Sequence, residues 1–124
     1  MVWEIELAEE VNDWFLTLCR EDPVTAERVE DAIDVLECRG PALGRPMADR
    51  IKGSEIHNLK ELRPASSGAS EVRILFVFDP RRCAVLLVAG DKRNRWSRWY
   101  DEAIPLAEQR YKRHLAELEV DNDD

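Results

Sequence analysis

Two apolar segments in the second half of the chain constrain its fold most, because each has the composition of a buried β-strand. The first, EVRILFVFD (71–79), alternates so that one face is wholly apolar and the other carries Arg73, Leu75 and Val77. The second, CAVLLVAG (83–90), is apolar on both faces, as in a central strand. Because PRR (80–82) suits a tight turn, the two segments predict an antiparallel hairpin inside a sheet.

Helical periodicity dominates the N-terminal third. Apolar residues recur at helical spacing from Val11 to Cys19, which predicts a helix over 8–20. A second helix is expected from Pro23, with Asp22 as its N-cap and Gly40 at its end. The short turn between them predicts an antiparallel helical pair, preceded by a short strand over 2–7.

The remaining elements complete an α+β fold. A long loop is expected over 40–55, a strand over 56–63 and a turn over 64–70. Apolar spacing from Ile104 to Leu118, with Pro105 in the first turn, predicts a C-terminal helix. We therefore expect a small, mostly antiparallel sheet with the two N-terminal helices on one face and the other face partly open. The chain is interpreted as one domain, 1–119, followed by an acidic tail, 120–124.

Several functional classes are disfavoured by simple features of the chain. No apolar run is long enough to span a membrane, and the N-terminus lacks the pattern of a signal peptide, so a cytoplasmic protein without a membrane partner is expected. The three cysteines, Cys19, Cys38 and Cys83, are too widely spaced to indicate a disulfide framework or a zinc site.

The net charge of −8 conceals a strong asymmetry along the chain. Residues 1–38 hold 2 basic and 12 acidic residues, and residues 101–124 hold 3 and 8. Residues 39–100 hold 13 basic and 6 acidic residues, a local charge of +7. Because screening limits a charge's reach to about 8 Å, the local balance matters more to a ligand than the total.

The run GDKRNRWSRWYDEA (90–103) is the most concentrated basic and aromatic stretch. Its basic and aromatic members are Lys92, Arg93, Arg95, Trp96, Arg98, Trp99 and Tyr100. Arginine binds phosphate bidentately and aromatic rings stack unpaired bases, so the run fits a nucleic-acid-binding rim at the end of the preceding strand. The alternative is that the arginines lie in a solvated loop and the aromatic residues pack the last helix.

Arg73 stands out because it interrupts an otherwise apolar strand. It must reach water, a carboxylate or an anionic ligand, so it forms either an ion pair with Glu61 or Glu71 or the floor of an anion site. Of the two histidines, His57 fits either a general acid–base residue or a polar strand-edge residue, whereas His114 is expected near the end of the last helix as a cation favourable to its C-terminus.

The order of elements, with IKGSEIHNLKELR, EVRILFVFD and LLVAGDKRNRWSRWYDEAIPLAEQRY, resembles the RelE/HigB family of type II toxins, more narrowly its phage-derived HigB-like subgroup. The resemblance covers Val2 to about Leu118. It implies a RelE-like fold and a ribosome-dependent mRNA endonuclease, in which the ribose 2′-hydroxyl attacks the adjacent phosphate without a metal or other cofactor. It also implies a cognate antitoxin, expected to be a small helix-turn-helix protein through which alone the toxin meets operator DNA.

The resemblance also suggests site residues. Arg73 matches the strand arginine that contacts the scissile phosphate, and Arg93 or Arg95 matches a second phosphate ligand. Tyr100 matches a tyrosine that stacks on or orients the substrate. Lys60 and Arg63 supply basic residues on the preceding strand, although Glu61 stands near a position where the family has lysine. His57 is then the nearest candidate for proton transfer, and the general base is not assigned.

Two other functions fit the same scaffold. ParE-like relatives share the fold but inhibit DNA gyrase, and an inactive relative would act only by binding its antitoxin. The fold alone does not separate these hypotheses, whereas the run of basic and aromatic residues favours RNA.

Overall fold

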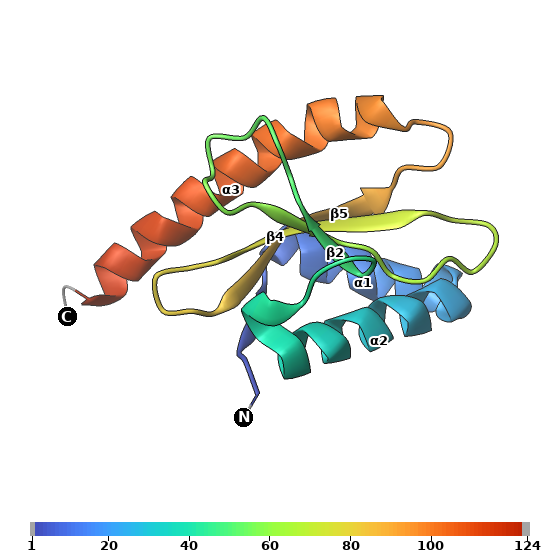
Figure 1. The fold of residues 1–124 in the computed structure, drawn as a ribbon, viewed down its shortest axis with the longest axis horizontal. Helices are drawn as coiled ribbons and strands as arrows, with labels where there is room; N and C mark the ends of the chain where they lie inside the picture. The colour runs from blue at the N-terminus through green and yellow to red at the C-terminus, as the bar shows by residue number, and fades with distance from the viewer. Residues whose placement is uncertain (1, 123–124) are drawn as a thin grey trace.

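The computed structural model describes residues 2–122. Its elements, in chain order, are β1 (Ile5–Leu7), α1 (Glu9–Glu21), α2 (Pro23–Arg39), the 3₁₀ turn η1 (Gly40–Ala42), β2 (Ala48–Arg50), β3 (Lys60–Leu62), β4 (Val72–Phe78), β5 (Ala84–Asp91) and α3 (Ser97–Asn122). The expected α+β architecture is confirmed: a five-stranded sheet lies between α1 and α2 on one side and α3 on the other (Figure 1).

The β4–β5 hairpin is the centre of the sheet, as its apolar sequence predicted. The strand order is β1-β5-β4-β3-β2, and only the β1–β5 pairing is parallel. Alternation along β4 sends Ile74 and Phe76 into the core beneath α1 and α2, and sends Leu75 and Val77 toward α3. Arg73 therefore lies on the α3 face, opposite Gly90 of β5.

The α1–α2 pair begins and ends where the sequence signals place it. The Asp22 side chain accepts hydrogen bonds from the backbone N–H and the hydroxyl of Thr25, which caps α2 before Pro23. Gly40 takes a φ of 57° at the other end, and the Trp3 ring fills the space that a side chain would need there. Val29, Ala32 and Leu36 pack this pair on the sheet.

The face that was expected to be partly open is covered by α3. This helix begins at Ser97 rather than near Ile104, because Trp99, Ala103 and Ala107 extend its buried stripe at four-residue spacing. Pro105 lies inside the helix, on its exposed side. The helix also continues to Asn122, so the first three residues of the expected tail are helical, while Asp123 and Asp124 lie outside the described residues.

Two further differences concern the sheet's far edge. The loop expected over 40–55 contains a short strand, β2, which pairs with β3. The strand expected over 56–63 is confined to Lys60–Leu62, since residues 56–58 form a turn before it. None of the described helices has an apolar stretch that could cross a membrane.

Candidate nucleic-acid interface

Arg73 has a cationic side chain without an acidic partner. Its Nη1 donates to the Val72 carbonyl at 2.8 Å, and its buried Nε has no acceptor in the described part of the chain. Within residues 2–122, no carboxylate oxygen lies within 4.0 Å of this guanidinium, so neither Glu61 nor Glu71 forms the ion pair that the sequence left open. Glu71 lies on the same face and likewise has one buried oxygen without a partner. The charge of Arg73 is therefore available to an anionic ligand.

Tyr100 projects from the first turns of α3 toward the buried end of β3. Its hydroxyl donates to Glu61 Oε2 at 2.6 Å, and Arg63 donates from Nε to Glu61 Oε1 at 2.8 Å. Arg63 in turn contacts Asp49 of β2 at 3.3 Å. Burial and the hydrogen bond to Glu61 raise the pKa of Tyr100 well above its ordinary value, although the positive charge of Arg73 opposes that shift. The phenol is therefore neutral at physiological pH and donates a hydrogen bond to Glu61.

The loop from β5 to α3 is held in a fixed turn beside Tyr100. Asp91 Oδ1 accepts the backbone N–H groups of Glu71 and Arg93, both at 2.9 Å. Trp96 has a φ of 44°, an uncommon conformation for a bulky residue, and its ring is 62% exposed. The Lys92 ammonium lies 5.2 Å from the Trp96 ring and 5.6 Å from the Tyr100 ring. An exposed aromatic surface thus adjoins a basic one.

The two arginines left as alternatives by the sequence have different surroundings. Arg95 is bound to Glu102 at 2.6 Å on the side of α3 that faces α1, together with Trp14. Arg93 donates from Nη1 to the Gly68 carbonyl at 2.6 Å and, within residues 2–122, has no carboxylate within 4.0 Å. Arg93 therefore keeps its charge for a ligand, whereas the charge of Arg95 is compensated. Arg98 lies exposed on the first turn of α3 and likewise forms no ion pair among the described residues.

Three other sequence candidates do not join this group. His57 lies in a pocket with Phe78 and Tyr111, and Phe78 is five residues along β4 from Arg73, which is about 17 Å. Lys60 points toward η1, where its Nζ approaches the Pro41 carbonyl at 3.3 Å. Trp99 is 5% exposed and packs over Gly90, which confirms the packing alternative for this tryptophan.

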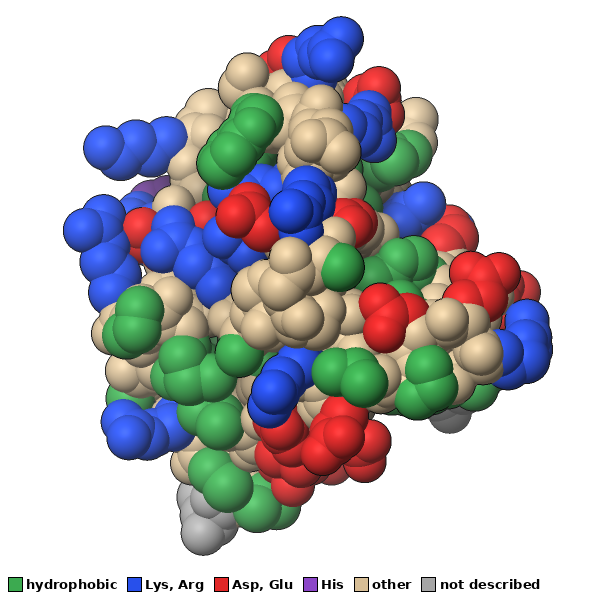
Figure 2. All heavy atoms as spheres, turned by 90° about the vertical axis from the view of Figure 1, so that its right-hand side faces the viewer, with side chains coloured by type: hydrophobic (Ala, Val, Ile, Leu, Met, Phe, Trp, Pro, Cys, Tyr) green, Lys and Arg blue, Asp and Glu red, His purple; other side chains and the backbone are tan. Residues whose placement is uncertain are grey.

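The cationic surface occupies one end of the molecule. Figure 2 views that end and shows many Lys and Arg side chains in its upper and left parts, with some Asp and Glu between them, whereas a larger group of Asp and Glu lies at the bottom. The site cations that form no ion pair among residues 2–122 are Arg73, Lys92, Arg93 and Arg98. This group joins the middle of the sheet to the start of α3, so the chain presents a surface of unpaired positive charge despite its net charge of −8.

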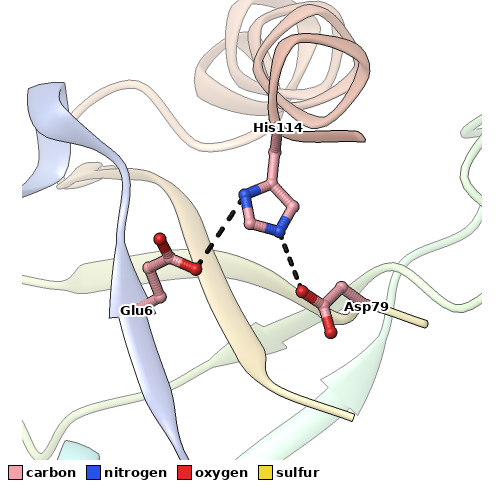
Figure 3. Close-up of side chains that lie close together, drawn as sticks. All are labelled: Glu6, Asp79 and His114. Atoms are coloured by element: carbon pink, nitrogen blue, oxygen red, sulfur yellow. Dashed lines mark hydrogen bonds and ion pairs between the residues drawn. The ribbon is translucent and has the colours of Figure 1, made fainter. Parts of the chain in front are cut away.

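A second polar cluster, missed by the sequence analysis, lies at the opposite end of β4. His114 is buried, not placed at the end of α3, and its ring lies between Asp79 at 2.9 Å and Glu6 at 4.0 Å (Figure 3). Arg81 lies 3.1 Å from both carboxylates. Burial opposes ionisation of Asp79, but hydrogen bonds from His114, the Cys83 N–H and Arg81 lower the pKa of this carboxyl.

His, Asp and Glu are metal-ligand types, but the surroundings of Asp79 favour a structural role. Asp79 Oδ1 accepts the backbone N–H groups of Arg81 and Cys83, and Oδ2 accepts from Arg81 and His114. Protein donors thus already occupy both carboxylate oxygens. The cluster ties α3 to the β4–β5 turn and to β1, which holds the helix whose first turn carries Tyr100.

Comparison with known proteins agrees with this architecture. The family model of the phage-derived Gp49-like proteins matches residues 13–112. The chain belongs to this family of HigB/RelE-type toxins. It is 52% identical over 111 residues to the Mycobacterium tuberculosis protein named as toxin HigB2, covering 90% of this chain and 54% of that protein. It is 49% identical over 110 residues to the one named HigB3, covering 89% and 91% respectively. The chain thus spans about half of HigB2 and most of HigB3.

The fold of this HigB/RelE-type protein is shared with a solved toxin. A free-state structure of Escherichia coli RelE, a mutant with two arginines replaced by alanine, superposes with a TM-score of 0.59 at 13% identity. The match covers 85% of this chain and 97% of RelE. At this identity the likeness concerns the fold alone, which confirms the architecture expected from the sequence.

Proposed function

We propose that this chain is a ribosome-dependent endoribonuclease, the toxin of a type II toxin–antitoxin pair, and that it cleaves mRNA at the surface formed by Arg73, Arg93 and Tyr100. Family membership supports the toxin role. The observation that carries the nuclease role is the guanidinium of Arg73, which pairs with no carboxylate among residues 2–122. It lies opposite Gly90, over which Trp99 packs next to the hydrogen-bonded Tyr100. A gyrase inhibitor or a passive antitoxin-binding module would not require this arrangement.

The reaction needs stabilisation of the negative charge on the phosphate oxygens. It also needs removal of the proton from the 2′-hydroxyl and delivery of a proton to the leaving 5′-oxygen. In attack by the 2′-hydroxyl, negative charge builds up on the phosphate oxygens, and guanidinium groups stabilise it strongly where water is partly excluded. Arg73 meets this need from the sheet, and Arg93 meets it from the loop. Tyr100 orients the ribose, because its hydroxyl is fixed by a 2.6 Å bond to Glu61.

The exposed ring of Trp96 provides a surface for an unpaired base next to the reacting phosphate. Stacking of one base on an aromatic side chain contributes roughly 1–3 kcal/mol. Lys92, which lies over both Trp96 and Tyr100, places a further charge where the RNA backbone would pass. We assign His57 and Lys60 no part in this step, because they lie outside the group.

The proposed partners follow from the same surface. The proposed target, the ribosome with its mRNA, is cytoplasmic. Both are polyanions, so association of the chain with them should weaken with added salt. The antitoxin, proposed to be a small helix-turn-helix protein, would bring carboxylates to this cationic end of the sheet and so block RNA. Contact with operator DNA would then run through the antitoxin.

The test is controlled expression of the chain alone in a bacterium, with growth and mapped mRNA 5′ ends as readouts. Wild type should stop growth and produce cuts in translated messages, with DNA supercoiling unchanged. Arg73→Ala should abolish both effects while thermal unfolding stays close to wild type. Arg28→Ala removes an equal charge from the exposed face of α2 and should remain toxic. Soluble wild-type protein that leaves messages intact would refute the proposal.

A further inference from the structure

We infer that Glu61 is the proton acceptor of the cleavage reaction and that it acts through the hydroxyl of Tyr100. The inference rests on the proposed nuclease function. It begins from one contact: the Tyr100 hydroxyl donates to Glu61 Oε2 at 2.6 Å, across 39 residues of sequence. A bond this short between a phenol and a carboxylate is a strong, charge-assisted one.

Glu61 has an unusual position for a residue with only a structural role. Its side chain is 5% exposed, on the α3 face of β3, opposite Leu75 of β4. Burying a carboxylate is costly unless it is paired and hydrogen-bonded. The pairing is asymmetric: Arg63 occupies Oε1 and Tyr100 alone among the described residues bonds to Oε2. The oxygen that meets the phenol is therefore the one able to take up a proton.

Tyr100 is suited to pass a proton on, but not to retain a negative charge. Its raised pKa, caused by burial and by the bond to Glu61, disfavours the phenolate. In a concerted transfer no phenolate is needed, because the oxygen accepts one proton while it releases another. Arg73 lies opposite Gly90, which is covered by Trp99, and the Tyr100 ring packs on Trp99 at 5.1 Å, so a phosphate bound by Arg73 would lie on the same side of the sheet as the phenol.

The proposed step balances as follows. The 2′-hydroxyl passes its proton to the Tyr100 oxygen as the original Tyr100 proton moves to Glu61 Oε2. O2′ bonds to phosphorus, the P–O5′ bond breaks, and O5′ leaves with that electron pair and takes a proton from water. The products are a 2′,3′-cyclic phosphate and a 5′-hydroxyl. Glu61 then returns its proton to water through Tyr100, which restores the carboxylate.

Charged side chains from several neighbouring elements surround Glu61 and Tyr100. They are Asp49 of β2, Arg63 after β3, Arg73 of β4 and Lys92 before α3. Three of the four are cations and the fourth, Asp49, is bound to Arg63. The carboxylate of Glu61 is thus surrounded mainly by positive charge.

The experiment measures single-turnover cleavage of ribosome-bound mRNA by purified protein at one fixed, near-neutral pH. Glu61→Gln keeps an acceptor for Tyr100 but cannot take up a proton, so the rate at saturating protein should drop more than 100-fold with little change in half-saturation. Glu61→Asp, which restores a carboxylate, should recover part of the rate. Glu108→Gln, which alters a carboxylate of α3 bonded to Ser54, is the matched control and should stay active.

Combining variants separates a relay from independent effects. If Glu61 works only through Tyr100, the double variant Glu61→Gln/Tyr100→Phe should be no slower than the slower single variant. If the double variant loses rate by the product of the two single losses, the two residues act independently and the relay is overturned. A Glu61→Gln rate within threefold of wild type would also overturn it. Neither result would affect the proposed cleavage of mRNA or the role of Arg73 in it. If wild type does not cleave at all, the proposed function fails and the relay fails with it. Loss of rate accompanied by a lowered unfolding temperature in both Glu61 variants would assign Glu61 a structural role and also overturn the relay.

Discussion

Replacing Gly90 by alanine tests whether packing against the sheet positions the helix that carries Tyr100. Gly90 lies opposite Arg73 on β5, and Trp99 occupies the space above it. A Cβ placed at Gly90 would lie 2.6 Å from Trp99 Nε1 and 3.3 Å from Cε2. Real Cβ atoms do not approach ring atoms this closely, so either the indole or the start of α3 must shift.

The expected loss in the free energy of unfolding depends on how easily Trp99 can move. Trp99 is 5% exposed and belongs to the core cluster with Leu75, Leu87 and Ala103, so it has little free space. Inserting a methyl group into such a core typically costs about 1–3 kcal/mol. For a chain of 124 residues, that corresponds to a fall in unfolding temperature of roughly 3–15 °C. Because the Tyr100 ring lies 5.1 Å from that of Trp99, the shift should also lengthen the bond to Glu61 and slow cleavage.

Thermal unfolding by circular dichroism, paired with the cleavage assay, measures both effects. Gly44→Ala is the matched control, since a Cβ there meets nothing within 4 Å, and it should leave the unfolding temperature unchanged or slightly higher. Trp99→Phe removes Nε1, so it should recover part of the loss when combined with Gly90→Ala. A Gly90→Ala protein as stable and as active as Gly44→Ala would refute the packing argument.

Three further predictions follow from the cited geometry. The pKa of Asp79 is lower in the folded protein than in the unfolded chain, where it is near 4, so the ionised carboxylate stabilises the fold above that pH. This stabilisation is lost as the pH falls through the folded pKa. Asp79→Asn should therefore lower the unfolding temperature at pH 7 and make the unfolding temperature fall less steeply from pH 5 to 3. Trp96→Ala should leave stability unchanged but weaken RNA binding, whereas Trp99→Ala should cost about 3–5 kcal/mol in denaturant unfolding. Arg93→Ala should slow cleavage more than tenfold in the single-turnover assay and Arg95→Ala less than threefold, because only Arg95 is paired with a carboxylate.

The central fold was predictable because it depends on local patterns. The β4 and β5 segments each combine strong apolar character with a clear period, and α2 has a capping residue, a proline and a glycine at the expected places. β2 was missed because three residues carry no measurable period, and only their pairing with β3 makes them a strand. The start of α3 was missed because Trp99 was grouped with the basic loop.

The site was predictable only in part, because its members are joined by long-range contacts. Arg73 was recognisable as a charge in an apolar strand, and Tyr100 was proposed from the family resemblance. The role of Glu61 as the partner of Tyr100 depends on the pairing of β3 with β4 and on the position of α3, neither of which the local sequence encodes. The same holds for His114, whose partner Asp79 is 35 residues away.

Net charge was the most misleading feature of the sequence, and the structure explains why. Counting charges shows that the middle of the chain is basic, but not which cations are already neutralised. Ion pairs with carboxylates hold Arg45, Arg63, Arg81, Arg95, Arg110 and Arg113. The surface around Tyr100 retains cations that form no such pair among residues 2–122, which is the condition for binding phosphate at a site within an acidic protein. The arginines that we propose to bind phosphate are therefore distinguished by their lack of a carboxylate partner rather than by their number.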